Sequence, residues 1–124
     1  MKLRILGDSL RLRLSKSDVE TFAKTGRVSD VIRFGGGARM SYALEHSDAV
    51  EVLSASFAEA EVLVRMPTSM ARGWADTDEI TLQASQPLDG DDTLALLVEK
   101  DFKCAVPRAG EEDYDGFEHP TGGC

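Results

Sequence analysis

The chain has 124 residues, of which 42% are hydrophobic and 29% are charged, and its formal net charge is −8. These proportions are ordinary for a single globular domain that buries a core without disulfides or metal ions as staples. No run approaches the ~20 apolar residues of a membrane span, and the first residues lack the pattern of a secretion signal. We therefore expect a cytoplasmic protein that makes no membrane contact, with Cys104 and Cys124 reduced.

The negative charge is unevenly distributed along the chain. Residues 1–48 hold nine Lys or Arg against six Asp or Glu, a net of +3, which leaves −11 for residues 49–124. The overall charge disfavours a protein that binds nucleic acid or anionic lipid over its whole surface, because that binding is driven by electrostatic attraction. The asymmetry predicts one basic and one acidic face.

The first half predicts two hairpins with a helix between them. Residues 2–6 and 10–14 alternate apolar and basic side chains around a Gly-Asp-Ser turn, which is typical of a β-hairpin. Ser15 and Asp18 fit a capping box and Gly26 fits a left-handed stop, so a helix is expected between them. Residues 28–34 and 40–44 then predict a second hairpin around three glycines. The side chains expected to face the core are Leu3, Ile5, Leu10, Leu12, Leu14, Val19, Phe22 and Ala23.

The second half predicts the same order of elements. Residues 50–57 and 61–66 form a hairpin, and Pro67 is expected at the first helical position, where its missing amide has no partner to lose. Residues 80–84 and 93–99 form a closing hairpin. The buried stripe of the short helix between these hairpins is expected to be Met70, Ala71, Trp74 and Ala75.

A faint internal repeat joins the two halves. Leu12–Val28 aligns with Val64–Ile80 at a constant offset of 52 residues, with four identities in seventeen positions and Phe22 on Trp74. Repeated units usually share one core. The sequence therefore predicts a single α+β domain over residues 1–124, mostly β, with two short helices. Its two ββαββ halves, 1–48 and 49–100, are expected to form a compact barrel or a pair of packed sheets, followed by an acidic tail over 101–124.

Two resemblances accompany this pattern. Residues 2–20 with Gly26-Arg-Val28, and again residues 66–69 with 78–80, resemble the swapped-hairpin unit of AbrB and MazE-type regulators. In that family two chains exchange hairpins to complete one small barrel, so the resemblance implies that two fused copies complete it within one chain. Asp8 stands where the family usually has Asn, and the second copy's first hairpin lacks basic residues, so only one DNA-contacting hairpin would be basic. Taken whole, the chain also resembles a family of small bacterial proteins of unknown function.

Two surface segments are candidate contact sites. Lys2, Arg4, Arg11 and Arg13 project from one face of the first hairpin and could meet phosphates or an acidic partner. The alternative is a solvated face whose cations discourage edge pairing. In the tail, Phe102, Tyr114 and Phe117 are spaced among acidic residues, a composition typical of a segment that docks on a partner. In MazE-type proteins such an extension binds the toxin, whereas here it can also dock on its own sheet.

Metal binding, phosphate binding and catalysis find little support. Cys104, Asp113, His119 and Cys124 fit no zinc spacing, and the glycine run 35–37 precedes a strand rather than a helix. His46, Ser47 and Asp48 are neighbours in the sequence, whereas a catalytic triad is assembled from separated positions whose side chains converge. We therefore expect no cofactor and a non-enzymatic binding or regulatory module that acts through electrostatic contacts with a protein partner or by self-association. The alternatives are an AbrB/MazE-like DNA-binding regulator or antitoxin, and a small enzyme with an unrecognised site.

Overall fold

The structure is a computed structural model that describes residues 1–103 and 115–118. Within these residues it contains ten strands and two helices, and neither helix has the length and apolar content that a membrane crossing requires. The elements are β1 (Lys2–Ile5), β2 (Ser9–Leu14), α1 (Lys16–Thr25), β3 (Arg27–Gly35), β4 (Ala38–Ser47), β5 (Ser54–Ala58), β6 (Glu61–Pro67), α2 (Thr68–Ala75), β7 (Thr81–Pro87), β8 (Thr93–Lys100), β9 (Phe102–Lys103) and β10 (Phe117–Glu118).

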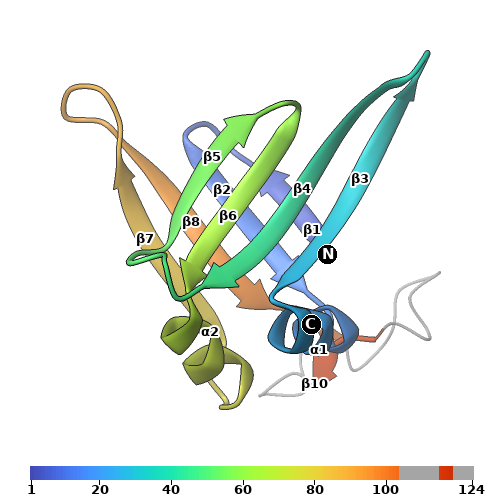
Figure 1. The fold of residues 1–124 in the computed structure, drawn as a ribbon, viewed down its shortest axis with the longest axis vertical. Helices are drawn as coiled ribbons and strands as arrows, with labels where there is room; N and C mark the ends of the chain where they lie inside the picture. The colour runs from blue at the N-terminus through green and yellow to red at the C-terminus, as the bar shows by residue number, and fades with distance from the viewer. Residues whose placement is uncertain (104–114, 119–124) are drawn as a thin grey trace.

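Eight of these strands form two four-stranded sheets, with the orders β1-β2-β8-β7 and β3-β4-β6-β5. Each sheet has a parallel pair at its centre, β2 with β8 or β4 with β6, and an antiparallel hairpin on either side. Each sheet therefore takes one hairpin from each half of the chain. The four hairpin turns all lie at one end of the molecule, and the two helices lie at the other (Figure 1).

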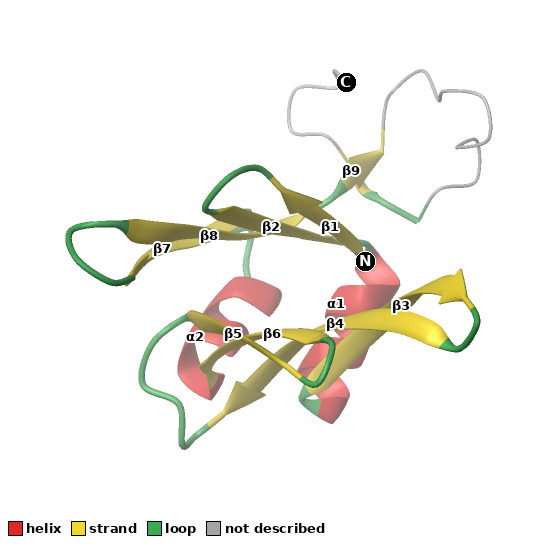
Figure 2. Ribbon diagram, turned by 90° about the horizontal axis from the view of Figure 1, so that it is seen from above, coloured by secondary structure: helices red, strands yellow, loops and turns green. Residues whose placement is uncertain are grey.

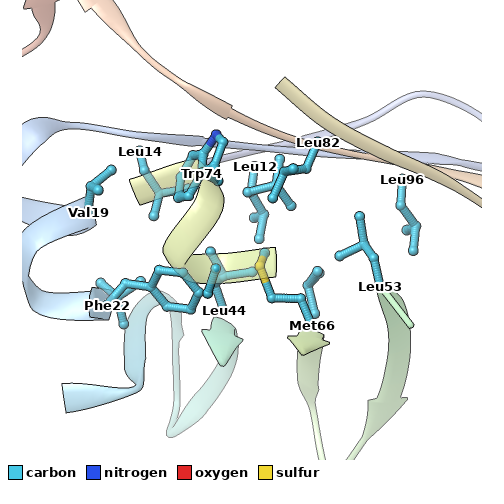
Figure 3. Packing of buried hydrophobic residues seen from close by; sticks show 14 residues of the cluster. Leu12, Leu14, Val19, Phe22, Leu44, Leu53, Met66, Trp74, Leu82 and Leu96 are labelled. Atoms are coloured by element: carbon cyan, nitrogen blue, oxygen red, sulfur yellow. The ribbon is translucent and has the colours of Figure 1, made fainter. Parts of the chain in front are cut away.

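The two sheets face each other as layers, and the helices close the space between them at one end (Figure 2). Side chains from both sheets and both helices meet in one core, in which Trp74 and Phe22 are fully buried. Their rings contact each other edge to face, with centroids 6.2 Å apart. Figure 3 shows Leu12 and Leu14 from one sheet facing Leu44 and Met66 from the other across these aromatic rings.

The strand arrangement decides between the two predicted architectures. Among the described strands neither sheet closes on itself, so the molecule consists of two open sheets packed together, in the α+β class, and is not a closed barrel. The sheets are joined along one side by Gln86 of β7, whose side-chain amide exchanges two hydrogen bonds with the backbone of Ala55 in β5, at 2.7 and 2.9 Å. This contact covers part of two edge strands that would otherwise invite pairing with another chain.

The helix termini follow from local chemistry. Ser15 Oγ accepts a hydrogen bond from the Asp18 amide, and an Asp18 carboxylate oxygen accepts one from the Ser15 amide, so the predicted capping box is confirmed. Gly26 ends α1 at φ 82°, a conformation that favours glycine. Pro67 is the N-cap of α2 rather than its first helical residue, because β6 continues to that position.

Two residues expected in the core are exposed. Ile5 is 59% exposed because it lies at the end of the edge strand β1, which has a neighbouring strand on one side only. Ala23 is exposed because it lines the open cleft between the two helices, and α1 buries Val19 and Phe22. Several strands also differ in length from their predicted ranges. β4 runs on to Ser47, whereas β5 begins only at Ser54.

Candidate functional site at the hairpin end

The basic residues of the β1–β2 hairpin are mostly paired within the chain. Arg13 Nε lies 2.7 Å from Glu99 Oε1, and Arg11 Nε lies 3.5 Å from the same oxygen. Lys2 Nζ lies 3.0 Å from Asp101 Oδ2. The parallel pairing of β2 with β8 sets Arg13 directly opposite Glu99. These charges are therefore partly neutralised before any ligand arrives.

Arg4 is the exception in this predicted site. It lies opposite Arg11 in the β1–β2 register, is exposed, and makes no ion pair with the described residues. The structure thus brings the four predicted cations onto one hairpin but leaves only Arg4 without an acidic neighbour in the part of the chain that it describes.

The described parts of the predicted tail site contact the body of the protein. Phe102 and Phe117 meet edge to face with centroids 6.3 Å apart, and Phe117 packs against the core. The backbone amide and the hydroxyl of Ser17 both donate to a carboxylate oxygen of Asp115, which lowers the pKa of that exposed carboxyl group. Residues 115–118 therefore lie against the body of the protein beside the start of α1, while Tyr114 lies outside the described residues.

Lys100 ties this part of the tail to the helix end. Its Nζ donates to the Thr77 carbonyl at 2.6 Å and lies 5.7 and 5.5 Å from the ring centroids of Trp74 and Phe117. Burial lowers the pKa of this lysine, and the nearby carboxylates of Asp78 and Glu79 oppose that shift. A buried lysine between two aromatic rings contributes to packing, and none of its described contacts forms a binding surface.

The β3–β4 hairpin projects beyond the rest of its sheet. β4 begins to pair with β6 only at Ser41, which lies opposite Glu61, so residues 31–40 form a two-stranded extension that we call the arm. A turn at Gly36-Gly37 closes the arm. In Figure 1 it is the long hairpin at the upper right. An isolated two-stranded hairpin is marginally stable at best in water, so a cover for the arm would stabilise it.

The arm exposes both apolar and basic side chains. Phe34 is 67% exposed, and Ile32 and Val31 are 45% and 43% exposed. Arg33 and Arg39 lie directly opposite each other, and neither makes an ion pair with a described residue. The arm therefore combines uncovered aromatic and aliphatic surface with two cations, a mixture that is enriched at protein–protein contacts.

The other three turns at this end also expose apolar side chains, but their charges are acidic. We call the four turns, residues 6–8, 36–37, 59–60 and 88–92, together with the arm, the hairpin end. The large apolar residues exposed in these three turns or at the strand ends beside them are Ile5, Leu6, Phe57 and Leu88, and we include Ile5 and Phe57 in the hairpin end. The acidic residues of these turns are Asp8, Glu59, Asp89, Asp91 and Asp92.

The described residues line several clefts, two of which adjoin the helices. One, of about 390 Å³, is mainly apolar and opens between β5 and β7 beside Leu53 and Met70. The other, of about 130 Å³, lies between the two helices and is lined by His46, Arg72 and Asp76. His46 Nδ1 lies 3.1 Å from Thr68 Oγ1, and its ring packs on Phe22. The second cleft bears on the enzyme alternative because it places His46 beside ionisable side chains.

No group of three or more metal-ligating side chains converges within the described residues. Cys104, Asp113, His119 and Cys124, which we considered as metal ligands, lie outside them. The glycine run 35–37 closes a hairpin, as its sequence context indicates.

The exposure of the arm was not predicted, although the sequence of β3 carries a signal for it. In a strand with one buried face apolar residues occupy alternate positions, whereas Val31, Ile32 and Phe34 place apolar side chains on both faces of β3. Apolar residues on both faces of an edge strand indicate a surface that something else covers.

A family model, described as a family of unknown function (DUF7009), matches residues 1–121, so the chain belongs to that family. A search of curated proteins and a search of solved structures found no match. The resemblance to AbrB and MazE-type regulators therefore stays a prediction.

Proposed function

We propose that this member of the DUF7009 family is a cytoplasmic, non-enzymatic protein-binding module whose contact surface is the hairpin end, with the arm as its main contact. The observation that carries the proposal is the combination of Phe34 at 67% exposure with the neighbouring Arg33 and Arg39, which have no ion pair among the described residues. Exposed aromatic and arginine side chains that lie together contribute most of the binding energy in many protein interfaces.

The charge distribution favours a protein partner with an acidic, partly apolar surface. Three of the four cations of the β1–β2 hairpin are engaged by Glu99 and Asp101, and only Arg4 has no ion pair among the described residues, so most of the electrostatic attraction for a partner comes from the arm. Phe34 and Ile32 lie beside these arginines. Their apolar surface is removed from water only where the partner also presents apolar groups. A contact of this kind depends on charge for orientation and on apolar burial for affinity.

Internal duplication is part of the proposal. It is supported by the order of elements, which is strand-strand-helix-strand-strand in each half. If each strand is replaced by its counterpart in the other half, the order β1-β2-β8-β7 becomes β5-β6-β4-β3, which is the order of the second sheet. The fully buried Phe22 and Trp74 at corresponding places in α1 and α2 support it too. On this basis the arm and the β7–β8 hairpin are corresponding parts that differ in charge.

The test is photo-crosslinking from the arm. A photoreactive phenylalanine derivative replaces Phe34 in one variant and the exposed Lys24 of α1 in a control variant. In cell extract we expect covalent protein adducts from position 34 and none from position 24. An excess of the wild-type protein without the photoreactive group should suppress these adducts, whereas an excess of the Arg33→Asp, Arg39→Asp variant should not. Equal labelling from both positions would overturn the proposal.

A DNA-binding regulator is the second candidate function, because a two-stranded ribbon that carries two arginines side by side has the shape that enters the major groove. The discriminating measurement is salt-dependent retention on duplex DNA. The DNA-binding function requires that charge reversal at Arg33 and Arg39 abolish retention, whereas the protein-binding function predicts no retention of the wild type.

A further inference from the structure

We infer that the hairpin end is a self-association surface: a second copy of this chain binds it, with the arm of each protomer on the β7–β8 loop, residues 88–92, of its partner. This inference rests on the proposed function and names the partner. The arm and the loop occupy corresponding positions, since each is the outer hairpin that extends past the central parallel pair of its sheet.

The two projections carry opposite charge. The arm holds Arg33 and Arg39, and the loop holds Asp89, Asp91 and Asp92. None of the five makes an ion pair with another described residue, so all five charges remain available to a partner. Opposite patches of this kind steer two molecules together and fix how they are oriented.

Apolar surface accompanies the charge on both projections. Phe34 and Ile32 lie beside the arginines of the arm, and Leu88, 37% exposed, begins the loop. Between the two projections the turns of the remaining hairpins expose Leu6 and Phe57, at 68% and 67%. The same turns also carry Asp8 and Glu59, so an interface across the whole hairpin end would combine apolar side chains with charged groups, and the opposite charges of the arm and the loop would set its orientation.

The placement of the projections fits a two-fold axis. The arm and the loop lie on opposite sides of the hairpin end in both views (Figures 1 and 2). If a second copy faces this end after half a turn about an axis across it, each arm meets the partner's loop, and the arm–loop contact occurs twice. Such an isologous interface closes on itself and produces a dimer rather than a filament.

The experiment is a charge exchange followed by mass measurement. Wild-type protein is examined by light scattering from about 1 μM to about 1 mM, the range in which an interface of modest affinity dissociates. We expect a mass that rises with concentration to twice the 13.5 kDa of the chain. Two variants are made, an arm-reversed one (Arg33→Asp, Arg39→Asp) and a loop-reversed one (Asp89→Lys, Asp91→Lys, Asp92→Lys).

Each variant alone is expected to dimerise about tenfold or more weakly than the wild type, because both of its arm–loop contacts now join like charges. An equimolar mixture is expected to form a heterodimer, since an acidic arm then meets a basic loop and a basic arm meets an acidic loop. The matched control, Lys24→Asp with Glu20→Lys, reverses exposed charges on α1 and should dimerise like the wild type.

Three outcomes overturn the inference: a wild type that stays monomeric throughout the concentration range, reversed variants that dimerise as tightly as the wild type, or a mixture that stays monomeric. Circular dichroism of each variant shows whether it is folded, and the mixture test works only with folded partners. The proposed function is overturned by a different result, equal crosslinking from positions 34 and 24. If position 34 forms adducts with other proteins and the chain does not self-associate, the protein-binding function stands and the second copy is excluded as the partner.

Discussion

Four aromatic side chains mark the difference between the two ends of the molecule. At the helix end Phe22 and Trp74 are completely buried and touch each other, whereas at the hairpin end Phe34 and Phe57 are each 67% exposed. The helix end also satisfies its polar groups, since Trp74 Nε1 donates to the Ile80 carbonyl at 2.9 Å. We therefore expect stability to be concentrated where the helices close the sheets, and contacts with other molecules to be made at the open end.

The largest expected effect is at the helix end. Trp74→Ala removes a completely buried side chain from the point where both sheets and both helices meet. We expect the free energy of unfolding to fall by about 3–5 kcal/mol. Urea denaturation followed by circular dichroism measures it, because Trp74 is the sole tryptophan and its fluorescence is lost with it.

Trp74→Phe is the control for this prediction. It keeps an aromatic ring against Phe22 and removes the hydrogen bond to the Ile80 carbonyl, so a smaller loss of about 1–2 kcal/mol is expected. Equal losses for the two variants would mean that the ring contact does not hold the helix end together.

An intermediate effect is expected at the start of α1. Burial raises the pKa of Asp18, but hydrogen bonds from the N-terminal ammonium and Ser15, together with the ammonium charge, outweigh it and leave the pKa below its ordinary value of 3.8. The unfolded chain therefore binds this proton more readily than the folded one does, so the stability that Asp18 contributes is present above pH 3.8 and is lost as the pH falls below it.

Asp18→Asn should consequently lower the free energy of unfolding by about 1 kcal/mol near neutral pH. The difference in the free energy of unfolding between the variant and the wild type should become smaller as the pH is lowered below 3.8. Urea denaturation at a series of pH values measures both quantities. A gap that is constant with pH would show that the carboxylate charge does not contribute.

The smallest effect on stability is expected at the arm. Phe34→Ser changes a side chain that is 67% exposed, so the free energy of unfolding should stay within about 0.5 kcal/mol of the wild type. Dimer formation, measured by light scattering, should nevertheless weaken. If this substitution lowers the free energy of unfolding by as much as a core substitution does, the hairpin end also stabilises the fold and is not a contact surface alone.

Features that depend on neighbouring residues could be read from the sequence. The capping box of Ser15 and Asp18 involves residues three apart, and the hairpins depend on alternation over a few positions. The core positions Phe22 and Trp74 were identified by helical spacing. The exposure of Ile5 was not predicted because alternation reports which face of a strand a side chain occupies, while its burial also depends on its place at the end of an edge strand.

Pairings between distant strands were beyond the reach of sequence. Arg11 and Arg13 were candidates for an external ligand because alternation places them, with Lys2 and Arg4, on one face of the first hairpin. Glu99 comes to them only through the parallel pairing of β2 with β8, which joins residues 86 apart. The arm was missed for a related reason, since its exposure follows from where β6 begins to pair with β4.

The interleaving of the two halves has a consequence for how this protein reaches its native state. The central pair of each sheet joins a strand from the first half to one from the second, so neither half contains a complete sheet. The chain must close long loops before these contacts form, which predicts slow, all-or-none folding for so small a protein. A cut in the 48–53 connection would turn folding into the encounter of two fragments, each with uncovered strand edges until it meets the other.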